Sequence, residues 1–405
     1  MKFTTQKNEI VDALQMGASI AERRQTIPIL ANLRIVAKEG KIEITATDLE
    51  IQIRTTTEVT KIIEEGEITV SARKMSELCR TLPDGESLEF DLSNGKLAVS
   101  SKNFHADFAT ISALDFPELE IKEETNSLSI SSSVLQRLLD KTAFCMASQD
   151  VRYYLNGLLI EYKEGEVNAV ATDGHRLALA TSPLSDMSSI EGMRQIVPRK
   201  AVLELSKILK QENDEDIKVT FGDSSLSIQG KNLDFSTKLI DGKFPEYEKV
   251  LPSGEPNSLE VTKENLQSAL SRASVLSNEK YRGVRFELDT NTLKLTANNP
   301  EKESAEELLE VKYSGSPLEI GFNIGYILDV LGRIETDSIE LNFYGEESSC
   351  LIKEPGNQTE VYVIMPMRLL NVHCKIIYQE LQTFQRTRLI FKKREPFNNR
   401  AQWIR

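Results

Sequence analysis

One short pattern occurs three times in this chain: an apolar strand leads into an Asp or Asn turn, and a second alternating strand follows. The three copies read ITATDLEIQIRT (44–55), AVATDGHRLALA (169–180) and LTANNPEKESAEELL (295–309). Their turn residues Asp48, Asp173 and Asn299 are 125 and 126 residues apart. A fixed long period indicates tandem copies of one structural unit. The sequence therefore predicts three copies of one domain, each about 125 residues long.

The local pattern within each copy predicts an α+β fold, in which antiparallel sheets carry helices on one face. The expected strands alternate apolar and polar residues and are joined by hairpin-like turns, which favours antiparallel pairing. Each copy also contains two segments with helical periodicity, namely 7–20, 72–82, 132–147, 199–211, 262–276 and 325–334. We expect the three domains to span 1–124, 125–253 and 254–369, followed by a basic and flexible tail at 370–405.

The composition, with 40 % hydrophobic and 27 % charged residues, is that of an ordinary globular protein. The start of the chain has no signal-peptide character, and no apolar run reaches the length of a membrane span. We therefore expect a cytoplasmic protein. Four widely spaced cysteines favour reduced thiols over a disulfide framework or a zinc site; they are Cys79, Cys145, Cys350 and Cys374.

The net charge of −13 is unevenly distributed. Residues 370–405 carry eight basic and two acidic residues, a net of +6, so the remaining 369 residues sum to −19. Within that acidic part, basic residues gather on the expected helices, at Arg73, Lys74, Arg80, Arg137, Lys141, Arg199, Lys200, Lys207, Lys210, Lys263 and Arg272. Two interpretations stay open: solvated helix faces, or a recurring basic surface that contacts phosphates without reading their sequence.

The second copy of the repeated turn contains Asp173, His175 and Arg176, a combination that could suggest catalysis. Catalysis would need a nucleophile, a base and an orienting group that meet in space, and no motif supplies them. His105 and His373 have no metal-ligand spacing to His175. Because Asp and Asn recur at the turn while their neighbours change, we predict that Asp173 forms the turn. We expect no enzyme activity, no metal and no cofactor.

Seven segments occur in one order and spacing: QTIPILAN (25–32), DVRYYLNG (150–157), ATDGHRLA (171–178), DGKFPEYEKVLP (241–252), SNEKYRGVRF (277–286), TANNPEKESAEE (296–307) and YVIMPMRL (362–369). Through them the chain resembles, over residues 1–369, the bacterial sliding clamp, which is the beta subunit of DNA polymerase III. The resemblance implies a non-catalytic processivity factor: a head-to-tail ring dimer with helices lining a central hole, which slides on double-stranded DNA without reading its sequence.

The resemblance also implies which residues contact DNA, namely Arg24, Arg73, Gln149, Tyr153, Tyr154, Arg199 and Lys200. For Tyr153 and Tyr154, packing in the core is an equal alternative.

A groove is expected to bind short peptides of the replicative polymerase catalytic subunit, the clamp loader, other polymerases and mismatch-repair proteins; no membrane is implied. Its expected residues are Leu155, Thr172, Gly174, His175, Arg176, Leu177, Pro245, Lys249, Val250, Ser349, Val363, Ile364, Met365, Pro366, Met367 and Arg368. Methionines and aliphatic residues would make the pocket deformable, while His175 and Arg176 would form a polar edge. Lys249 stands where the family more often has arginine, which keeps the charge and loses bidentate geometry.

Ring closure would bring the third domain of one copy against the first domain of the next. The expected residues are Val275, Leu276, Glu301, Glu303, Glu306 and Glu307 on the third domain, and Lys74, His105 and Phe108 on the first. The basic set is small, so charge pairs would contribute modestly to closure.

The tail departs from the family pattern, which ends near Leu369. It could be a flexible extension, it could bind DNA, or QELQTF (379–384) could fold back into the groove. Two other functions are distinguishable in principle. A nucleotide- or metal-dependent enzyme would need a phosphate loop or a ligand cluster, and a pure interaction scaffold would need the groove without the basic helices.

Overall fold

The computed structural model describes residues 1–21, 27–119, 126–184, 192–210 and 215–368. Its contacts divide the chain into two compact units. The first contains residues 1–253, 329–341 and 351–364, and the second contains 254–328, 342–350 and the chain from 365 onward. The expected Arg24 contact and the tail at 370–405 lie outside the described residues.

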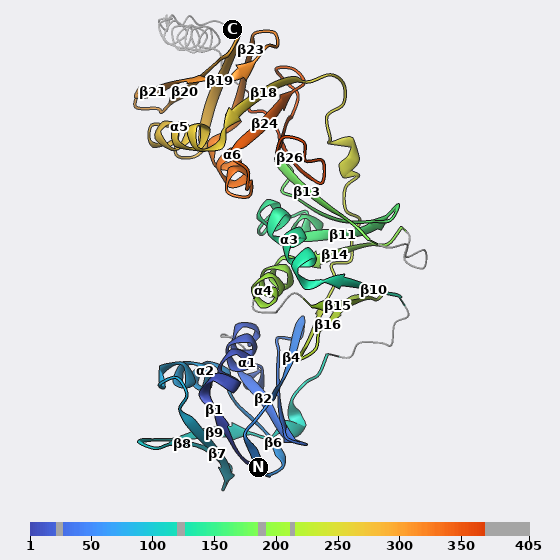
Figure 1. Ribbon diagram of the computed structural model, residues 1–405, viewed down its shortest axis with the longest axis vertical. Helices are drawn as coiled ribbons and strands as arrows, with labels where there is room; N and C mark the ends of the chain where they lie inside the picture. Colours follow the sequence, from blue (N-terminus) through green and yellow to red (C-terminus); the bar gives the residue numbers. More distant parts are fainter. Residues whose placement is uncertain (22–26, 120–125, 185–191, 211–214, 369–405) are drawn as a thin grey trace, which may run out of the picture. The chain divides into compact units, whose positions relative to one another are not determined.

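The three repeats fold into nearly the same succession of elements, which Figure 1 labels along the chain. The first and third repeats each have one short strand more, β5 and β22, than the described part of the second. The first repeat comprises β1 (Lys2–Gln6), α1 (Lys7–Ile20), β2 (Asn32–Lys38), β3 (Lys41–Thr47), β4 (Ile51–Glu58), β5 (Lys61–Glu64), β6 (Gly66–Ser71), α2 (Ala72–Thr81), β7 (Ser87–Ser93), β8 (Lys96–Ser101) and β9 (Phe104–Ile111). The second comprises β10 (Asn126–Ser131), α3 (Ser132–Thr142), β11 (Gly157–Lys163), β12 (Glu166–Thr172), β13 (Arg176–Pro183), β14 (Arg194–Pro198), α4 (Arg199–Leu209), β15 (Asp216–Phe221), β16 (Ser225–Gln229) and β17 (Leu233–Lys238).

The third repeat comprises β18 (Asn257–Thr262), α5 (Lys263–Val275), β19 (Gly283–Asp289), β20 (Thr292–Asn298), β21 (Ser304–Glu310), β22 (Lys312–Tyr313), β23 (Leu318–Asn323), α6 (Ile324–Leu331), β24 (Ser338–Phe343), β25 (Cys350–Lys353) and β26 (Glu360–Ile364). The predicted pair of helices per repeat is therefore confirmed. The helix predicted over 132–147 is shorter than expected: α3 ends at Thr142, and a 3₁₀ turn follows over Ala143–Cys145.

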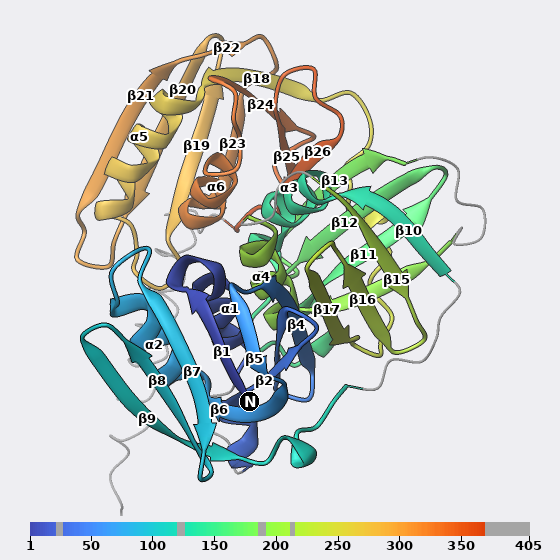
Figure 2. The ribbon, with the colours of Figure 1, turned by 60° about the horizontal axis from the view of Figure 1, so that its bottom comes forward.

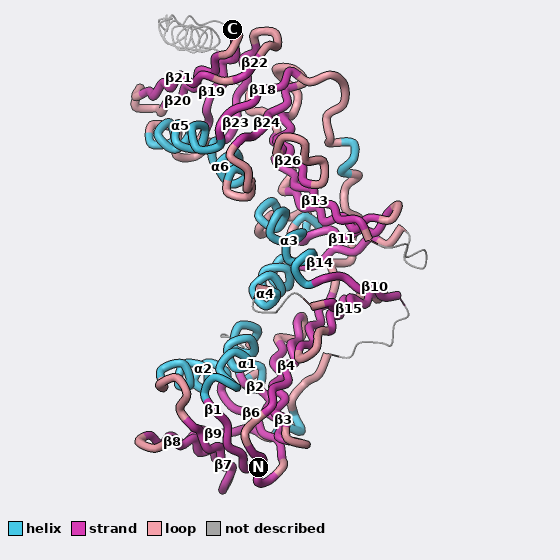
Figure 3. The backbone as a smooth tube through the Cα atoms, viewed as in Figure 1, coloured by secondary structure: helices cyan, strands magenta, loops and turns pink. Residues whose placement is uncertain are grey.

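All the strand pairs described are antiparallel, as the alternation predicts. In the first unit, thirteen strands form one sheet in the order β10-β15-β16-β17-β4-β3-β2-β6-β9-β8-β7-β1-β5. Residues alternate between buried and partly exposed along much of strands such as β2 and β7, because one face of the sheet packs against helices. Helices α1 and α2 lie together on the strands of the first repeat, and α3 and α4 on those of the second (Figures 2 and 3).

Consecutive repeats are joined by strand pairing at equivalent places. Strand β4, which follows the Asp48 turn, pairs with β17, the last strand of the second repeat. Strand β13, which follows the Asp173 turn, pairs with β26, the last strand of the third repeat. The second unit contains a four-stranded sheet in the order β21-β20-β19-β23, so β21, which follows the Asn299 turn, lies at the edge of that sheet.

Three cysteines are buried free thiols: Cys79, Cys145 and Cys350. Burial raises the pKa of Cys79 to about 12 and raises the pKa values of the other two as well. Since the thiolate is the reactive form, these thiols should be unreactive near neutral pH. Cys374 lies outside the described residues.

We predict that a variant ending at Leu369, which lacks Cys374, reacts with Ellman's reagent at pH 8 only after unfolding. Guanidinium chloride should then expose the three buried thiols. Rapid reaction of the native variant would show that at least one of these cysteines is accessible.

None of the described helices is long and apolar enough to cross a membrane.

Candidate functional site

The turn at Thr172–Arg176 is built by the Asp173 side chain. Its Oδ1 accepts the N–H groups of His175 at 2.9 Å and Arg176 at 3.0 Å. Thr172 Oγ1 donates to the Arg176 carbonyl at 2.7 Å and accepts the N–H of Gly174 at 3.1 Å. Gly174 has a φ of +87°, which glycine adopts without strain. The prediction that Asp173 forms a turn is confirmed.

The first repeat forms the same turn with different side chains. Asp48 Oδ1 accepts the N–H groups of Glu50 at 2.9 Å and Ile51 at 2.7 Å, and Leu49 takes the left-handed position with a φ of +73°. In the third repeat the turn is one residue longer, because Asn299 Oδ1 accepts the N–H of Glu303 at 2.9 Å. The turn is therefore common scaffold, and His175 and Arg176 are particular to the second copy.

The side chain of Arg176 points into the protein and is only 12 % exposed. Its guanidinium donates to Asp173 Oδ2 at 3.0 Å, to Asp329 Oδ2 at 2.5 Å and to the carbonyl of Phe144 at 3.0 Å. Burial lowers its pKa, but the hydrogen bond to Asp329 together with the charges of Asp173 and Asp329 raises it overall. Arg176 thus holds parts of the chain together, which differs from the expected polar edge, whereas His175 is exposed.

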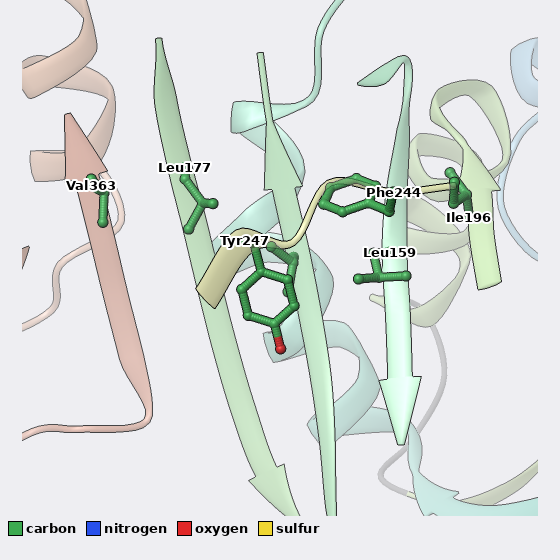
Figure 4. Close-up of a cluster of buried hydrophobic side chains, with 7 residues drawn as sticks. Leu159, Leu177, Ile196, Phe244, Tyr247 and Val363 are labelled. Atoms are coloured by element: carbon green, nitrogen blue, oxygen red, sulfur yellow. The ribbon is translucent and has the colours of Figure 1, made fainter. Parts of the chain in front are cut away.

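An apolar cluster lies beside this turn. Leu177 on β13 is directly opposite Val363 on β26, and both side chains are buried. Phe244 and Tyr247, from the segment between β17 and β18, complete the cluster with Leu159, Val170 and Ile196 (Figure 4). Of the expected groove residues, Val250 packs against this cluster, whereas the side chain of Lys249 is exposed and pairs with Glu246.

The hydroxyl of Tyr247, a member of this cluster, takes part in a polar network that was not predicted from the sequence. Tyr247 donates its hydroxyl proton to Glu161 at 2.6 Å, and Arg194 pairs with the other oxygen of the same carboxylate at 2.9 Å. Burial, with the bond to Glu161, raises the pKa of Tyr247. From the motif GKFPEYEKV, Pro245 was predicted as a groove residue, but the aromatic residues Phe244 and Tyr247 make the buried apolar contacts.

Leu155 and Ile364 are buried in the first unit. Five further expected groove residues belong to the second unit: Ser349, Met365, Pro366, Met367 and Arg368. In that unit, the N–H of Met367 donates to the carbonyl of Gly321 at 2.8 Å, which fixes the segment against β23. Pro366, Met367 and Arg368 line a pocket of about 660 Å³ together with Glu319, Ile320, Gly321, Glu346 and Glu347.

The expected DNA-facing residues have different environments. Arg73 is exposed on α2 and pairs with Glu77 one turn later. Gln149 is exposed and has a φ of +58°. The Tyr153 side chain is 57 % exposed and meets Tyr154 edge to face at 5.8 Å. Tyr154 instead packs partly against the apolar cluster, so core packing fits Tyr154 better than Tyr153. DNA contact by either residue stays a prediction.

Several expected helix cations are already paired within the chain. Lys200 on α4 pairs with the buried carboxylate of Asp48, and Arg199 donates to the carbonyl of Met146 at 2.9 Å. On α3, Lys141 is buried between Glu360 and Glu335, and Arg137 pairs with Glu360 at 2.6 Å. Both interpretations of the helix cations, a solvated face and a surface that contacts phosphates, were therefore wrong for Lys141.

The expected ring-closing residues lie at two places. In the second unit, Val275 ends α5 with its side chain exposed, Leu276 is partly exposed, and Glu307 receives two bonds from Arg272 at 2.6 and 2.9 Å. The carboxylates of Glu306 and Glu303 contact Lys294 and Asn299 respectively, and Glu301 is exposed.

In the first unit, Lys74 is exposed on α2, and His105 is exposed with its Nδ1 2.8 Å from Ser100 Oγ. Phe108 is buried within its own repeat, since it faces Leu97 on β8. Its expected contribution of free apolar surface is therefore small.

Models of three protein domains match the chain in order: the N-terminal domain of the DNA polymerase III beta subunit over residues 1–120, the central domain over 129–246 and the C-terminal domain over 248–368. The boundaries predicted from the repeat differ from these by a few residues, and the matches end at residue 368.

The beta sliding clamp of Pseudomonas aeruginosa is 42 % identical over 369 residues, which cover 91 % of this chain and all of the relative. That of Escherichia coli K12 is 40 % identical over the same shares. Among solved structures, a P. aeruginosa sliding clamp bound to griselimycin is 42 % identical with a TM-score of 0.88, and covers 91 % of this chain and 100 % of its own. The Thermotoga maritima beta subunit is 28 % identical with a TM-score of 0.85, at 91 % and 99 % coverage. The chain therefore belongs to the DNA polymerase III beta-subunit family, the sliding clamps, which are non-catalytic processivity subunits.

Proposed function

We propose that two copies of this chain close head to tail into a ring around double-stranded DNA in the cytoplasm. On DNA, the ring tethers the replicative polymerase, the clamp loader, other polymerases and mismatch-repair proteins through the groove beside the Asp173 turn. The observation that carries the proposal is the joint between neighbouring repeats, which occurs twice within the chain. The strand that forms one side of such a joint is still available in the third repeat, and the strand that forms the other side is still available in the first repeat.

The two joints within the chain follow one rule. The strand after an Asp turn pairs with the last strand of the next repeat, as β4 does with β17 and β13 with β26. The turn also meets the second helix of the next repeat, through Lys200 and Asp48 in the first case and through Arg176 and Asp329 in the second. Two joints with the same geometry support a third of the same kind.

The two strands of a third joint, β21 and β9, have free edges within the part of the chain that the structure describes. Strand β21 lies at the edge of its sheet, and β9 pairs with β6 only at Thr110 and Ile111, so its earlier residues have a neighbour on one side. Because β21 belongs to the third repeat and β9 to the first, the joint between two copies is head to tail. Two such joints close a ring, which avoids open filaments.

Charge supports the same joint. Arg73 is the second residue of α2, as Lys200 is of α4, and Lys74 follows it. The turn that would meet this helix in the third joint contains Glu301 and Glu303. Contacts of the exposed helix cations with phosphates would hold DNA without sequence preference.

The proposal is tested by mass and by retention on DNA. The full chain should have the mass of a dimer in light scattering. After loading, it should remain on nicked circular DNA and be lost from short linear duplexes. A monomer, or equal retention on both DNA forms, would contradict the ring.

Charge reversal separates a clamp from a scaffold that carries only the groove. With Lys207→Glu and Lys210→Glu together, two exposed cations outside the proposed joint are reversed. The dimer should form, and the salt dependence of DNA retention should become shallower by about one unit of slope for each lost phosphate contact. Unchanged retention would favour the scaffold.

A further inference from the structure

Arg176 joins the groove turn to helix α6, and the first repeat shows that the turn does not need it. The position equivalent to Arg176 is Ile51, and the Asp48 turn forms there with the same backbone bonds. The guanidinium therefore adds an attachment. It links the turn to Asp329, near the end of α6, and to the carbonyl of Phe144, after α3.

The ring of Phe144 lies among the side chains that make these contacts. The guanidinium carbon of Arg176 lies 5.5 Å from its centroid, and that of Arg333 lies at the same distance. Tyr362 on β26 meets the ring at 5.9 Å, one residue before Val363 of the apolar cluster. Cation–π contacts favour such positions. Phe144 thus contacts both the residue that anchors the turn and the strand that forms the other wall.

We propose that Asp329 and Phe144 are positioning residues of the peptide groove: they fix the Arg176 guanidinium, and through it the position of the His175 turn, which lies just beyond the last β13–β26 pair, Arg176 with Ile364. This inference rests on the proposed peptide-binding function of the groove. Asp329 acts through a charge-assisted hydrogen bond, which is stronger than a neutral bond and directional. Neither residue touches the peptide in this scheme.

The direct test is the substitution Asp329→Asn in the full-length chain, with griselimycin as the probe and calorimetry as the measurement. The variant keeps the shape of the side chain and removes its charge, so the turn keeps its backbone bonds. We expect affinity for griselimycin to fall about fivefold, as one charged hydrogen bond is weakened, with dimer mass and melting temperature unchanged. Asp329→Glu should restore part of the loss, and Phe144→Leu should also weaken binding.

A double-mutant cycle shows whether Asp329 acts through Arg176. If it does, Asp329→Asn should have little further effect in the Arg176→Lys background. The matched control is Glu67→Gln, which weakens an arginine–carboxylate pair with Arg34 in the first repeat, at 2.7 Å, and should leave affinity unchanged.

Two failures are distinguishable. If the unmodified chain binds griselimycin and Asp329→Asn binds it equally well, the positioning role is wrong and the groove stands. Additive losses in the cycle would also overturn the role, because they would show that Arg176 and Asp329 act independently. If the unmodified chain neither binds griselimycin nor stays on circular DNA, the proposed function itself fails.

Discussion

A chain that carries Val275→Asp and Leu308→Asp should be a monomer that is folded but cannot stay on circular DNA. These two side chains are 77 % and 70 % exposed, and they lie on α5 and β21. The pair formed by Arg272 and Glu307 ties the same helix to the same strand, so the two apolar residues flank one ion pair. Exposed apolar side chains grouped at an unpaired strand edge are typical of an interface.

The size of the effect follows from desolvation. A carboxylate placed in a closed interface without a partner costs several kcal/mol, and each 1.4 kcal/mol changes a dissociation constant tenfold. We therefore expect the dimer to weaken by at least about a hundredfold. Light scattering over a range of concentrations and the half-life on nicked circular DNA measure the two consequences.

The matched control is Ile63→Asp. Ile63 is also an exposed apolar residue, on β5, but three strands, β8, β7 and β1, separate β5 from β9, the first-repeat strand of the proposed joint. It should remain a dimer. If the double variant also remained a dimer with normal retention, the closure through β21 would be wrong.

The architecture was predictable because its signals are local and repeated. The period of 125 residues, the alternating strands and the Asp turns each occur within short segments. The turn at Asp173 could be interpreted correctly because the copy at Asp48 forms the same bonds with different neighbours. Comparison of the internal repeats thus distinguished the residues that form the turn from the residues particular to the second copy, without an alignment of related sequences.

The partners of charged side chains were not predictable in the same way. Lys141 was expected on an exposed helix face, either solvated or in contact with phosphates, yet it is buried against Glu360, which is 219 positions later in the chain. Arg176 was expected at a polar edge, and its partner Asp329 is similarly distant. The helical pattern gives the face on which a residue lies, but it does not show which later segment packs on that face. Phe144, Tyr247 and Asp329 were missed for this reason.

The second large effect is expected for Glu360→Ala, which should destabilise the chain by about 3 kcal/mol. The side chains of Glu360 and Lys141 are 6 % and 7 % exposed, and their charges are 3.1 Å apart. Arg137 donates to the other oxygen of Glu360 at 2.6 Å. Removal of the carboxylate would leave Lys141 buried with Glu335, which is itself exposed, as its remaining carboxylate partner.

Guanidinium titration followed by circular dichroism measures this loss. Glu260→Ala is the matched control, because it breaks an exposed pair with Lys312 at 2.9 Å, and such pairs contribute less than about 1 kcal/mol. Equal stability of the two variants would show that the buried group contributes no more than a surface pair.

The same variant should weaken the groove more than its stability loss alone explains. Glu360 begins β26 and pairs with Ala180. Three residues later Val363 meets Leu177, and one residue after that Ile364 meets Arg176, along the same pair of strands. A loosened start of β26 would shift Val363 relative to Leu177, so griselimycin should bind more weakly at temperatures where the variant is fully folded. Normal griselimycin binding at those temperatures would show that Glu360 affects only the stability of the chain. The position of the groove wall would then depend on the contacts of Arg176 with Asp329 and Phe144.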